Sequence, residues 1–332
     1  MKTGARVRAL RAMADGIELH GRSFLSITEL SDRQLYALFE LGRALEPWNR
    51  SGLDWLGGNV MVTLFYQPST RTRMSFEAAM LRLGGSVITE ATPLIASSAA
   101  KEESLNDAMR VISRYANVIV LRHYDDQEAR AGVVHSEAPV INGGFGNWEH
   151  PTQALLDLYT LWRTFGRVEG LHVCIAGPDL VAARTGHSMA LGLARLGARM
   201  TLASTSRYRM PEDMLAMLHA SGAEVEEVLD PDQASFNDLV SGMDYIYLPG
   251  CAAPKGAESD AYKKMMDDFY VRNETLAKVR NEQKRDIYIT HALPRRAGEM
   301  DPAIDASPSQ VCFRAILHSV SVRMALVAAI IG

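Results

Sequence analysis

Short apolar runs alternate with amphipathic stretches along almost the whole chain. Residues 30–46 carry an apolar side chain at every third or fourth position, which predicts a helix with Ser31 as its N-cap. Residues 59–66 are a short, mostly apolar, β-rich run typical of a buried parallel strand. The same kind of run recurs, and we expect further strands at 85–88, 117–122, 139–142, 171–177, 199–203, 223–227, 245–248 and 287–290.

Helical patterns fill most of the intervals between these runs. The alternation in both halves predicts an α/β protein with two doubly wound parallel-sheet domains. A long apolar pattern at 150–165 predicts a bridging helix between them, with Pro151 in its first turn, where a missing N–H costs nothing. A length of 332 residues agrees with two domains of about 150 each. In such sheets, ligands bind beyond the carboxyl ends of the strands.

Composition and charge narrow the class of protein. Hydrophobic residues make up 47% and charged residues 22%, which excludes disorder, collagen and coiled coil as the main architecture. The 35 basic and 39 acidic residues give a net charge of −4, so we expect neither nucleic acid nor a membrane as a partner. The most apolar stretch, 324–331, is far shorter than the ~20 residues of a membrane span and predicts a terminal helix packed on a core.

The three cysteines indicate the compartment. Cys174, Cys251 and Cys312 are too few and too far apart for a disulfide scaffold or a zinc cluster. They fit a reducing cytoplasm, and we expect a cytoplasmic protein without a metal site.

The strongest local signal follows the strand at 59–66. Residues 69–73 read Ser-Thr-Arg-Thr-Arg and open a helical pattern, so hydroxyls and guanidiniums meet the unpaired N–H groups of a helix start. Such a junction favours a phosphate. The plain structural alternative is an N-cap with two solvated arginines. Glu77 lies one turn beyond Arg73, so we expect Arg73 to be structural and Arg71 to contact the ligand.

Two further motifs are weak when taken singly. His150 and Gln153 share one helical face and are able to grip a carbonyl or amide group, although a histidine at a helix start is more often a capping or packing residue. Residues 291–295, His-Ala-Leu-Pro-Arg, follow a strand, and the proline there forces an extended loop that exposes carbonyl groups.

The three motifs in this order resemble the aspartate/ornithine carbamoyltransferase family. The resemblance covers nearly the whole chain, and the phrase at 149–161, EHPTQALLDLYTL, is closer to the aspartate branch. It implies a carbamoyl-phosphate domain formed by 1–149 and a C-terminal helix at about 313–332. The bridging helix at 150–165 leads to an acceptor domain at 166–312.

The resemblance also implies which residues bind carbamoyl phosphate. Thr72, Arg122 and His150 would donate to the carbonyl oxygen, where negative charge develops as the amine attacks. The leaving phosphate accepts the amine's proton, so no metal or organic cofactor is expected. The full set implied for carbamoyl phosphate is Ser69, Thr70, Arg71, Thr72, Arg122, His150, Gln153 and the carbonyl of Leu293.

A neighbouring subunit is part of the same implication. In the family, a loop from the adjacent subunit enters the site with a serine and a lysine; Lys101 matches the lysine, and Ser97 or Ser98 matches the serine. A homo-oligomer follows, most simply a trimer with sites between subunits. Without the resemblance, Lys101 would be a solvent-facing residue on a polar loop.

The acceptor side departs from the aspartate pattern. Arg184 matches the arginine that binds the acceptor's α-carboxylate, but Gly250 and Ala252 stand where an arginine and a glutamine grip the second carboxylate. Losing that cation costs several kcal/mol in a closed site.

Three interpretations of this departure remain open. The acceptor is a small amino-carboxylate, with L-aspartate favoured, and Lys255, Arg295 or Arg296 replaces the charge. Alternatively, the acceptor differs, for example a diamino acid or a ureido compound. The last alternative is a catalytically silent paralogue that serves as a structural or regulatory subunit of a partner enzyme.

Overall fold

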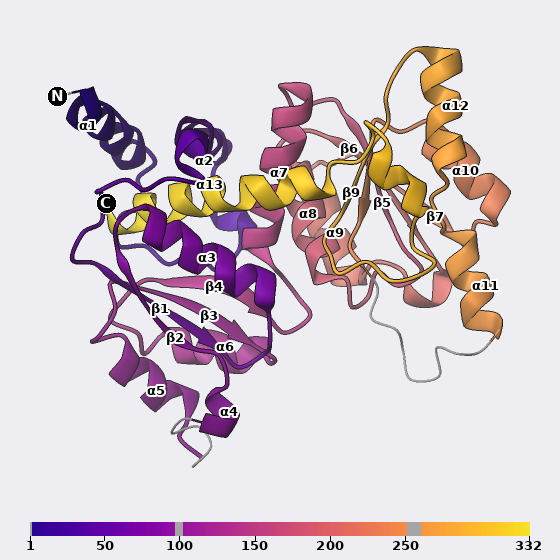
Figure 1. The fold of residues 1–332 in the computed structure, drawn as a ribbon. Coiled ribbons are helices and arrows are strands. Elements are labelled where there is room, and N and C mark those ends of the chain that lie inside the picture. Colours follow the sequence, from indigo (N-terminus) through magenta and orange to yellow (C-terminus); the bar gives the residue numbers. More distant parts are fainter. Residues whose placement is uncertain (1, 97–101, 251–259) are drawn as a thin grey trace. The chain divides into compact units, whose positions relative to one another are not determined.

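The computed structural model describes residues 2–96, 102–250 and 260–332 (Figure 1). The chain forms two compact α/β units, each with its own parallel sheet. The first unit comprises Met1–Tyr159 and Ile316–Gly332, and the second comprises Thr160–Ala315. The chain therefore passes between the units twice, within helices α7 (Pro151–Phe165) and α13 (Cys312–Ile331).

The first unit contains a four-stranded parallel sheet in the order β2-β1-β3-β4. Helix α3 packs on β1 and β2, and α6 packs on β3 and β4 (Figure 1). The described residues of this unit also form 3-10 turns at Ile27–Glu29 and Glu46–Trp48. Its helices and strands are α1 (Lys2–Asp15), α2 (Asp32–Leu45), β1 (Val60–Phe65), α3 (Thr70–Arg82), β2 (Ser86–Glu90), α4 (Pro93–Ala96), α5 (Leu105–Ile112), β3 (Val118–His123), α6 (Asp126–Val133) and β4 (Val140–Phe145).

The second unit contains a five-stranded parallel sheet in the order β7-β6-β5-β8-β9. Phe236 and Phe269 contribute to an apolar core against β5, β8 and β9. The unit also has 3-10 turns at Ser206–Tyr208 and Pro302–Ala306. Its helices and strands are β5 (His172–Ala176), α8 (Arg184–Arg195), β6 (Arg199–Ser204), α9 (Glu212–Ala220), β7 (Val225–Leu229), α10 (Gln233–Ser241), β8 (Tyr245–Leu248), α11 (Asp260–Asp268), α12 (Asn273–Gln283) and β9 (Tyr288–His291).

The strand register of the first sheet places Arg122 and the loop that leads into α3 at the same sheet edge. Phe65 at the end of β1 lies beside Arg122 of β3, so the loop into α3 and the arginine share one sheet edge. The β3–β4 register shifts between Leu121 and His123, and Arg122 donates to the Gly143 carbonyl at 2.9 Å. A Cβ at Gly143 would lie 3.1 Å from the Leu121 carbonyl oxygen, so this close approach favours glycine.

Most predicted elements are present, with a few local differences. Ser31 caps α2 in a reciprocal capping box with Gln34. The helical pattern at 102–115 predicts a longer helix than the structure has, because Ser104 is the N-cap and α5 begins at Leu105. Helices α1 and α6 were not predicted; both are short of strongly apolar residues, and α6 depends on Asp125, whose side chain accepts from the Glu128 N–H.

The C-terminal helix is longer than the apolar run suggested. Helix α13 is 20 residues long and, by length and composition alone, could cross a membrane. However, 72% of its most apolar window is buried inside the protein. A mostly buried apolar helix is typical of a core helix, as the sequence predicted.

Candidate active site

The Ser-Thr-Arg-Thr-Arg run forms the start of α3 at the carboxyl end of β1. Ser69 is the extended N-cap residue, and Thr72 is buried in the first turn. Arg71 is exposed, although partial desolvation lowers the pKa of its guanidinium. Arg73 instead pairs with Glu77 at 3.0 Å, as the sequence indicated. The first turn contains no acidic residue, so its N–H groups and hydroxyls form an anion-binding helix start.

Arg122, His150 and Thr72 form a buried cluster beside this helix start. The Arg122 Nη1 lies 3.3 Å from the His150 Nε2, and the Thr72 Oγ1 lies 3.3 Å from the same nitrogen. All three residues are at most 8% exposed. The structure thus brings together, from α3, β3 and the start of α7, the three residues expected to polarise a carbonyl.

The hydrogen-bond donors around His150 determine which of its ring nitrogens carries the hydrogen. A guanidinium has no acceptor, so the His150 Nε2 accepts from Arg122. The ring hydrogen then lies on Nδ1, which is 3.4 Å from the Thr152 Oγ1. In this arrangement Arg122 and Thr72 are the donors ready for a carbonyl oxygen. His150 becomes a donor at Nε2 only when that nitrogen gains a hydrogen, by protonation of the ring or by a change of tautomer after Arg122 turns to the substrate.

Two carboxylates position Gln153 and the segment before His150, and sequence reasoning missed both. The Gln153 Nε2 donates to Asp157 one turn further along α7, at 3.0 Å, which turns the amide oxygen away from Asp157. That oxygen is the atom expected to accept from the carbamoyl N–H₂ group. Glu149 is 2% exposed and accepts from the Ser26 hydroxyl at 2.8 Å, which anchors the segment just before His150.

A buried cation of α13 supports the start of α3. Arg323 is 3% exposed and lies over the Phe76 ring, 4.8 Å from its centroid. Its Nη1 donates to the Ser75 Oγ, and Ser75 in turn donates to the Thr72 carbonyl at 3.0 Å. Burial lowers the Arg323 pKa to about 9, while Asp157 acts to raise it. The C-terminal helix therefore braces the turn that carries Thr72.

The second unit presents Arg184 at the first position of α8. Burial lowers the Arg184 pKa to about 10. The adjacent Thr185 Oγ1 donates to the Pro249 carbonyl at 3.2 Å, which joins the start of α8 to the segment after β8. A cation at a helix N-terminus on the carboxyl edge of a parallel sheet suits an anionic ligand.

Residues after β8 and β9 complete this edge. Gly250 has a φ of +77°, and a Cβ there would lie 3.0 Å from the His291 Cε1. His291 is buried; its Nδ1 accepts from the Leu293 N–H at 2.7 Å, and its Nε2 lies 3.0 Å from the Glu299 Oε2. The position expected to carry a cation is therefore a left-handed glycine packed against an imidazole–carboxylate pair.

The other predicted site residues are placed as follows. Arg295 forms a bidentate pair with Asp305, at 2.5 and 2.8 Å, so its charge already has a partner. Arg296 has an exposed side chain. Leu293, expected to accept from the carbamoyl group, belongs to the second unit and has a φ of +58°. Ser97, Lys101 and Lys255 lie outside the described residues.

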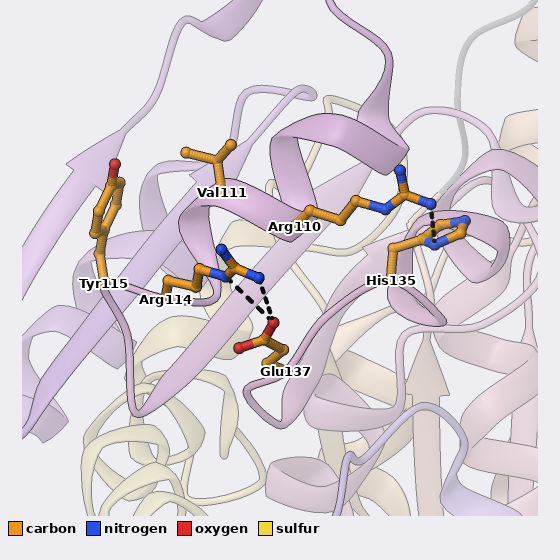
Figure 2. Close-up of a pocket in the computed structure, with 6 residues that line it drawn as sticks. All are labelled: Arg110, Val111, Arg114, Tyr115, His135 and Glu137. Carbon is orange, nitrogen blue, oxygen red and sulfur yellow. Dashed lines mark hydrogen bonds and ion pairs between the residues drawn. The ribbon is translucent and has the colours of Figure 1, made fainter.

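No group of three or more His, Cys, Asp or Glu suited to a metal ion occurs among residues 2–96, 102–250 and 260–332. A surface pocket beside α5 (Figure 2) contains none of the predicted site residues, and Arg114 on its wall pairs with Glu137 at 3.0 Å.

Family models match most of the chain in two parts. Residues 22–163 match the carbamoyl-phosphate binding domain of aspartate/ornithine carbamoyltransferase, and residues 169–330 match the Asp/Orn binding domain. The chain therefore belongs to the aspartate/ornithine carbamoyltransferase family and is a carbamoyltransferase.

Individual relatives differ in how similar they are. A ureidoglycine carbamoyltransferase of Rubrobacter xylanophilus is 63% identical over 100% of this chain and 98% of its own length. An aspartate carbamoyltransferase catalytic subunit of Methanopyrus kandleri is 37% identical over 94% of this chain and 97% of its own. The aspartate transcarbamoylase catalytic subunit of M. jannaschii superposes with a TM-score of 0.81 at 34% identity, covering 92% of this chain and 97% of that one.

Proposed function

We propose that this carbamoyltransferase uses ureidoglycine, or an amine of the same charge and shape, as its acceptor in place of aspartate. The 63% identity to a ureidoglycine carbamoyltransferase supports this acceptor, whereas the aspartate relative of M. kandleri is 37% identical. The structural observation that carries the proposal is Gly250, a left-handed glycine where the second carboxylate of aspartate would need a cation.

Shape alone does not separate the two acceptors. Both carry an α-carboxylate and an amine on one carbon, and the ureido arm –NH–CO–NH₂ is isosteric with the aspartate arm –CH₂–COO⁻. The difference is charge: one arm is a neutral group with N–H donors, and the other is an anion that only accepts. A site that has lost a cation therefore favours the ureido arm, because an unpaired anion in a desolvated site is costly.

The proposed reaction needs no group beyond the substrates and this chain. Residues 69–72 bind the phosphate, and Arg122 and Thr72 stabilise the negative charge on the carbonyl oxygen as the amine attacks. The C–O bond to phosphate then breaks, and the phosphate oxygen takes the proton from the amine. Arg184 holds the α-carboxylate of the acceptor. The products are phosphate and an acid with two ureido groups on one carbon.

Assembly is part of the proposal. Ser97 and Lys101 of a neighbouring subunit would complete the carbamoyl-phosphate site, and a homotrimer is the simplest arrangement that supplies them. Lys101→Ala should then abolish most activity, and mixing it with an inactive His150→Ala variant should restore part of the activity through hybrid sites. A Lys101→Ala enzyme with wild-type turnover would contradict this part.

A steady-state acceptor panel tests the function. Phosphate release from carbamoyl phosphate is measured with freshly prepared ureidoglycine, L-aspartate, L-asparagine and L-ornithine. Ureidoglycine is expected to give the highest kcat/KM, with the diureido acid identified by mass. A higher kcat/KM for aspartate would refute the proposed acceptor. Phosphate release that is equal in wild type and His150→Ala would instead favour a catalytically silent chain.

A further inference from the structure

Helix α7 contains a buried carboxylate one turn beyond Gln153. Asp157 is 1% exposed and lies four residues after Gln153, on the same face of the helix. The Gln153 Nε2 donates to the Asp157 Oδ2 at 3.0 Å. Charged side chains are rarely buried this completely unless they are paired, so the contact with Gln153 helps to retain the carboxylate inside the protein.

A buried cation favours the ionised form of Asp157. Arg323 of α13 is 3% exposed; burial lowers its pKa to about 9, and the Asp157 charge acts in the opposite direction. Because an interaction between two charges is mutual, Arg323 equally favours the carboxylate of Asp157 over the neutral acid. An ionised carboxylate only accepts hydrogen bonds. The group that faces Gln153 is therefore an acceptor and has no hydrogen to donate to the amide oxygen.

This acceptor determines which way round the Gln153 amide lies. The two ends of a primary amide have nearly the same shape, and hydrogen bonding distinguishes the oxygen from the N–H₂ group. With its nitrogen bound to Asp157, Gln153 presents its oxygen, which has no hydrogen-bond partner within the part of the chain that the structure describes. Gln153 is in the first turn of α7, and its backbone N–H donates to the His150 carbonyl at 3.0 Å. An available acceptor therefore lies one turn from the cluster of Thr72, Arg122 and His150.

We infer that Asp157 is a positioning residue through which this enzyme selects carbamoyl phosphate over acetyl phosphate. The two compounds are isosteric and differ in one group beside the carbonyl, which is N–H₂ in the first and CH₃ in the second. The Gln153 oxygen accepts from N–H₂ and not from CH₃, whereas an inverted amide would direct its own N–H₂ at the substrate's. The inference rests on the carbamoyl-phosphate site of the proposed function and is independent of the acceptor.

Two inert phosphonates isolate this choice from chemistry and from the acceptor. Phosphonoacetamide carries the N–H₂ group of carbamoyl phosphate, and 2-oxopropylphosphonate is its isostere with the CH₃ group of acetyl phosphate. Neither transfers its acyl group, because a CH₂ replaces the bridging oxygen. Calorimetry gives the dissociation constant of each for the full-length wild type. Wild type is expected to bind phosphonoacetamide about tenfold more tightly, the effect of one net hydrogen bond.

The variant Asp157→Asn keeps the side-chain size but offers an amide, which donates to the Gln153 oxygen as readily as it accepts from the nitrogen. It is expected to reduce the preference to within about threefold, mainly through weaker phosphonoacetamide binding. Asp157→Ser is a second, smaller neutral variant with the same expected effect. Gln153→Met removes the acceptor itself, and adding Asp157→Asn to it should change the preference no further. The control Asp15→Asn, at the exposed end of α1, should leave both affinities unchanged.

The outcomes separate this inference from the proposed function. Equal binding of the two phosphonates by wild type would overturn it without any variant. A tenfold preference retained in Asp157→Asn or Asp157→Ser, or equal weakening of both phosphonates, would show a purely structural role and also overturn it. An effect of Asp157→Asn that persists in the Gln153→Met background would show that Asp157 does not act through Gln153. Absence of ureidoglycine turnover in the acceptor panel refutes the proposed acceptor instead and leaves these binding results standing.

Discussion

His150 accepts a hydrogen bond from Arg122 across 3.3 Å, and this contact joins the end of β3 to the start of α7. Because the guanidinium can only donate, it holds the imidazole neutral with its acceptor nitrogen toward the arginine. The pair is buried and adjacent to Thr72, so a carbonyl oxygen placed there meets donors that are already oriented. Such preorganisation is the main source of rate in acyl-type transfers.

Replacing His150 tests the importance of that arrangement. His150→Ala should lower kcat by about 10²–10³, the usual cost of one oxyanion donor, because Arg122 loses the contact that orients it toward the carbonyl oxygen. The KM for carbamoyl phosphate should change less, because residues 69–72 still bind the phosphate. Steady-state kinetics at saturating acceptor gives both values. A loss confined to KM would mean that His150 only binds the ground state.

The hydrogen bond from Arg323 of α13 to Ser75 of α3 predicts that variants at these two residues have coupled effects on stability. Arg323→Met and Ser75→Ala should each destabilise the first unit, because each removes the same hydrogen bond under Thr72. Their effects on the free energy of unfolding should not add; a coupling of about 0.5–3 kcal/mol is typical of contacting residues. Urea unfolding of wild type, both single variants and the double variant measures it. Strict additivity would show that the brace is unimportant.

Gly250 and Gly222 form a matched pair for backbone strain. Both have a φ of +77°, but a Cβ at Gly222 meets nothing within 4 Å, whereas one at Gly250 approaches His291 at 3.0 Å. Gly222→Ala and Gly250→Ala should each lose about 1–2 kcal/mol of stability from the left-handed conformation. Only Gly250→Ala should also weaken the binding of N-carbamoylglycine, a stable analogue of ureidoglycine without the amine. Equal binding in the two variants would contradict the assignment of Gly250 to the acceptor site.

The lowered pKa of Arg184 predicts that the acceptor site binds a carboxylate less tightly at alkaline pH. Its pKa is lowered by burial to about 10, and only the protonated form binds a carboxylate, so affinity is lost as pH rises through that value. The dissociation constant of N-carbamoylglycine, which has no amine to titrate, should be constant from about pH 7 to 9 and rise about tenfold per unit above 10. In Arg184→Gln it should be weak and independent of pH. A flat wild-type profile would contradict the role of Arg184.

Local patterns in the sequence account for much of the anion-binding helix start at residues 69–73. The strand before residue 69, the hydroxyls and arginines after it, and the pairing of Arg73 with Glu77 are all contacts between near neighbours in the chain. Ser31 and its capping box are predictable for the same reason. Phosphate recognition by a helix start depends on one strand–helix junction, so it can be read from a short segment.

Contacts between segments that are distant in the sequence could not be predicted from these local patterns. Arg323 and Ser75 are 248 residues apart, and the apolar pattern around Arg323 gives no sign of its partner. The pairing of His291 with Glu299 is close in sequence, but its place beside Gly250 depends on the order β8-β9 in the sheet. The sequence indicated that a cation was missing at residue 250, whereas the anion beside it emerged only from the fold.

Direct competition between acceptors tests the central claim most closely. Wild-type enzyme receives a limiting amount of ¹³C-labelled carbamoyl phosphate with equal concentrations of freshly prepared ureidoglycine, L-aspartate and L-asparagine. The ratio of labelled products, measured by mass spectrometry, equals the ratio of kcat/KM values. Label is expected chiefly in the diureido acid, with asparagine, the other neutral arm, ahead of aspartate. Label that appears chiefly in N-carbamoyl-L-aspartate would contradict the account.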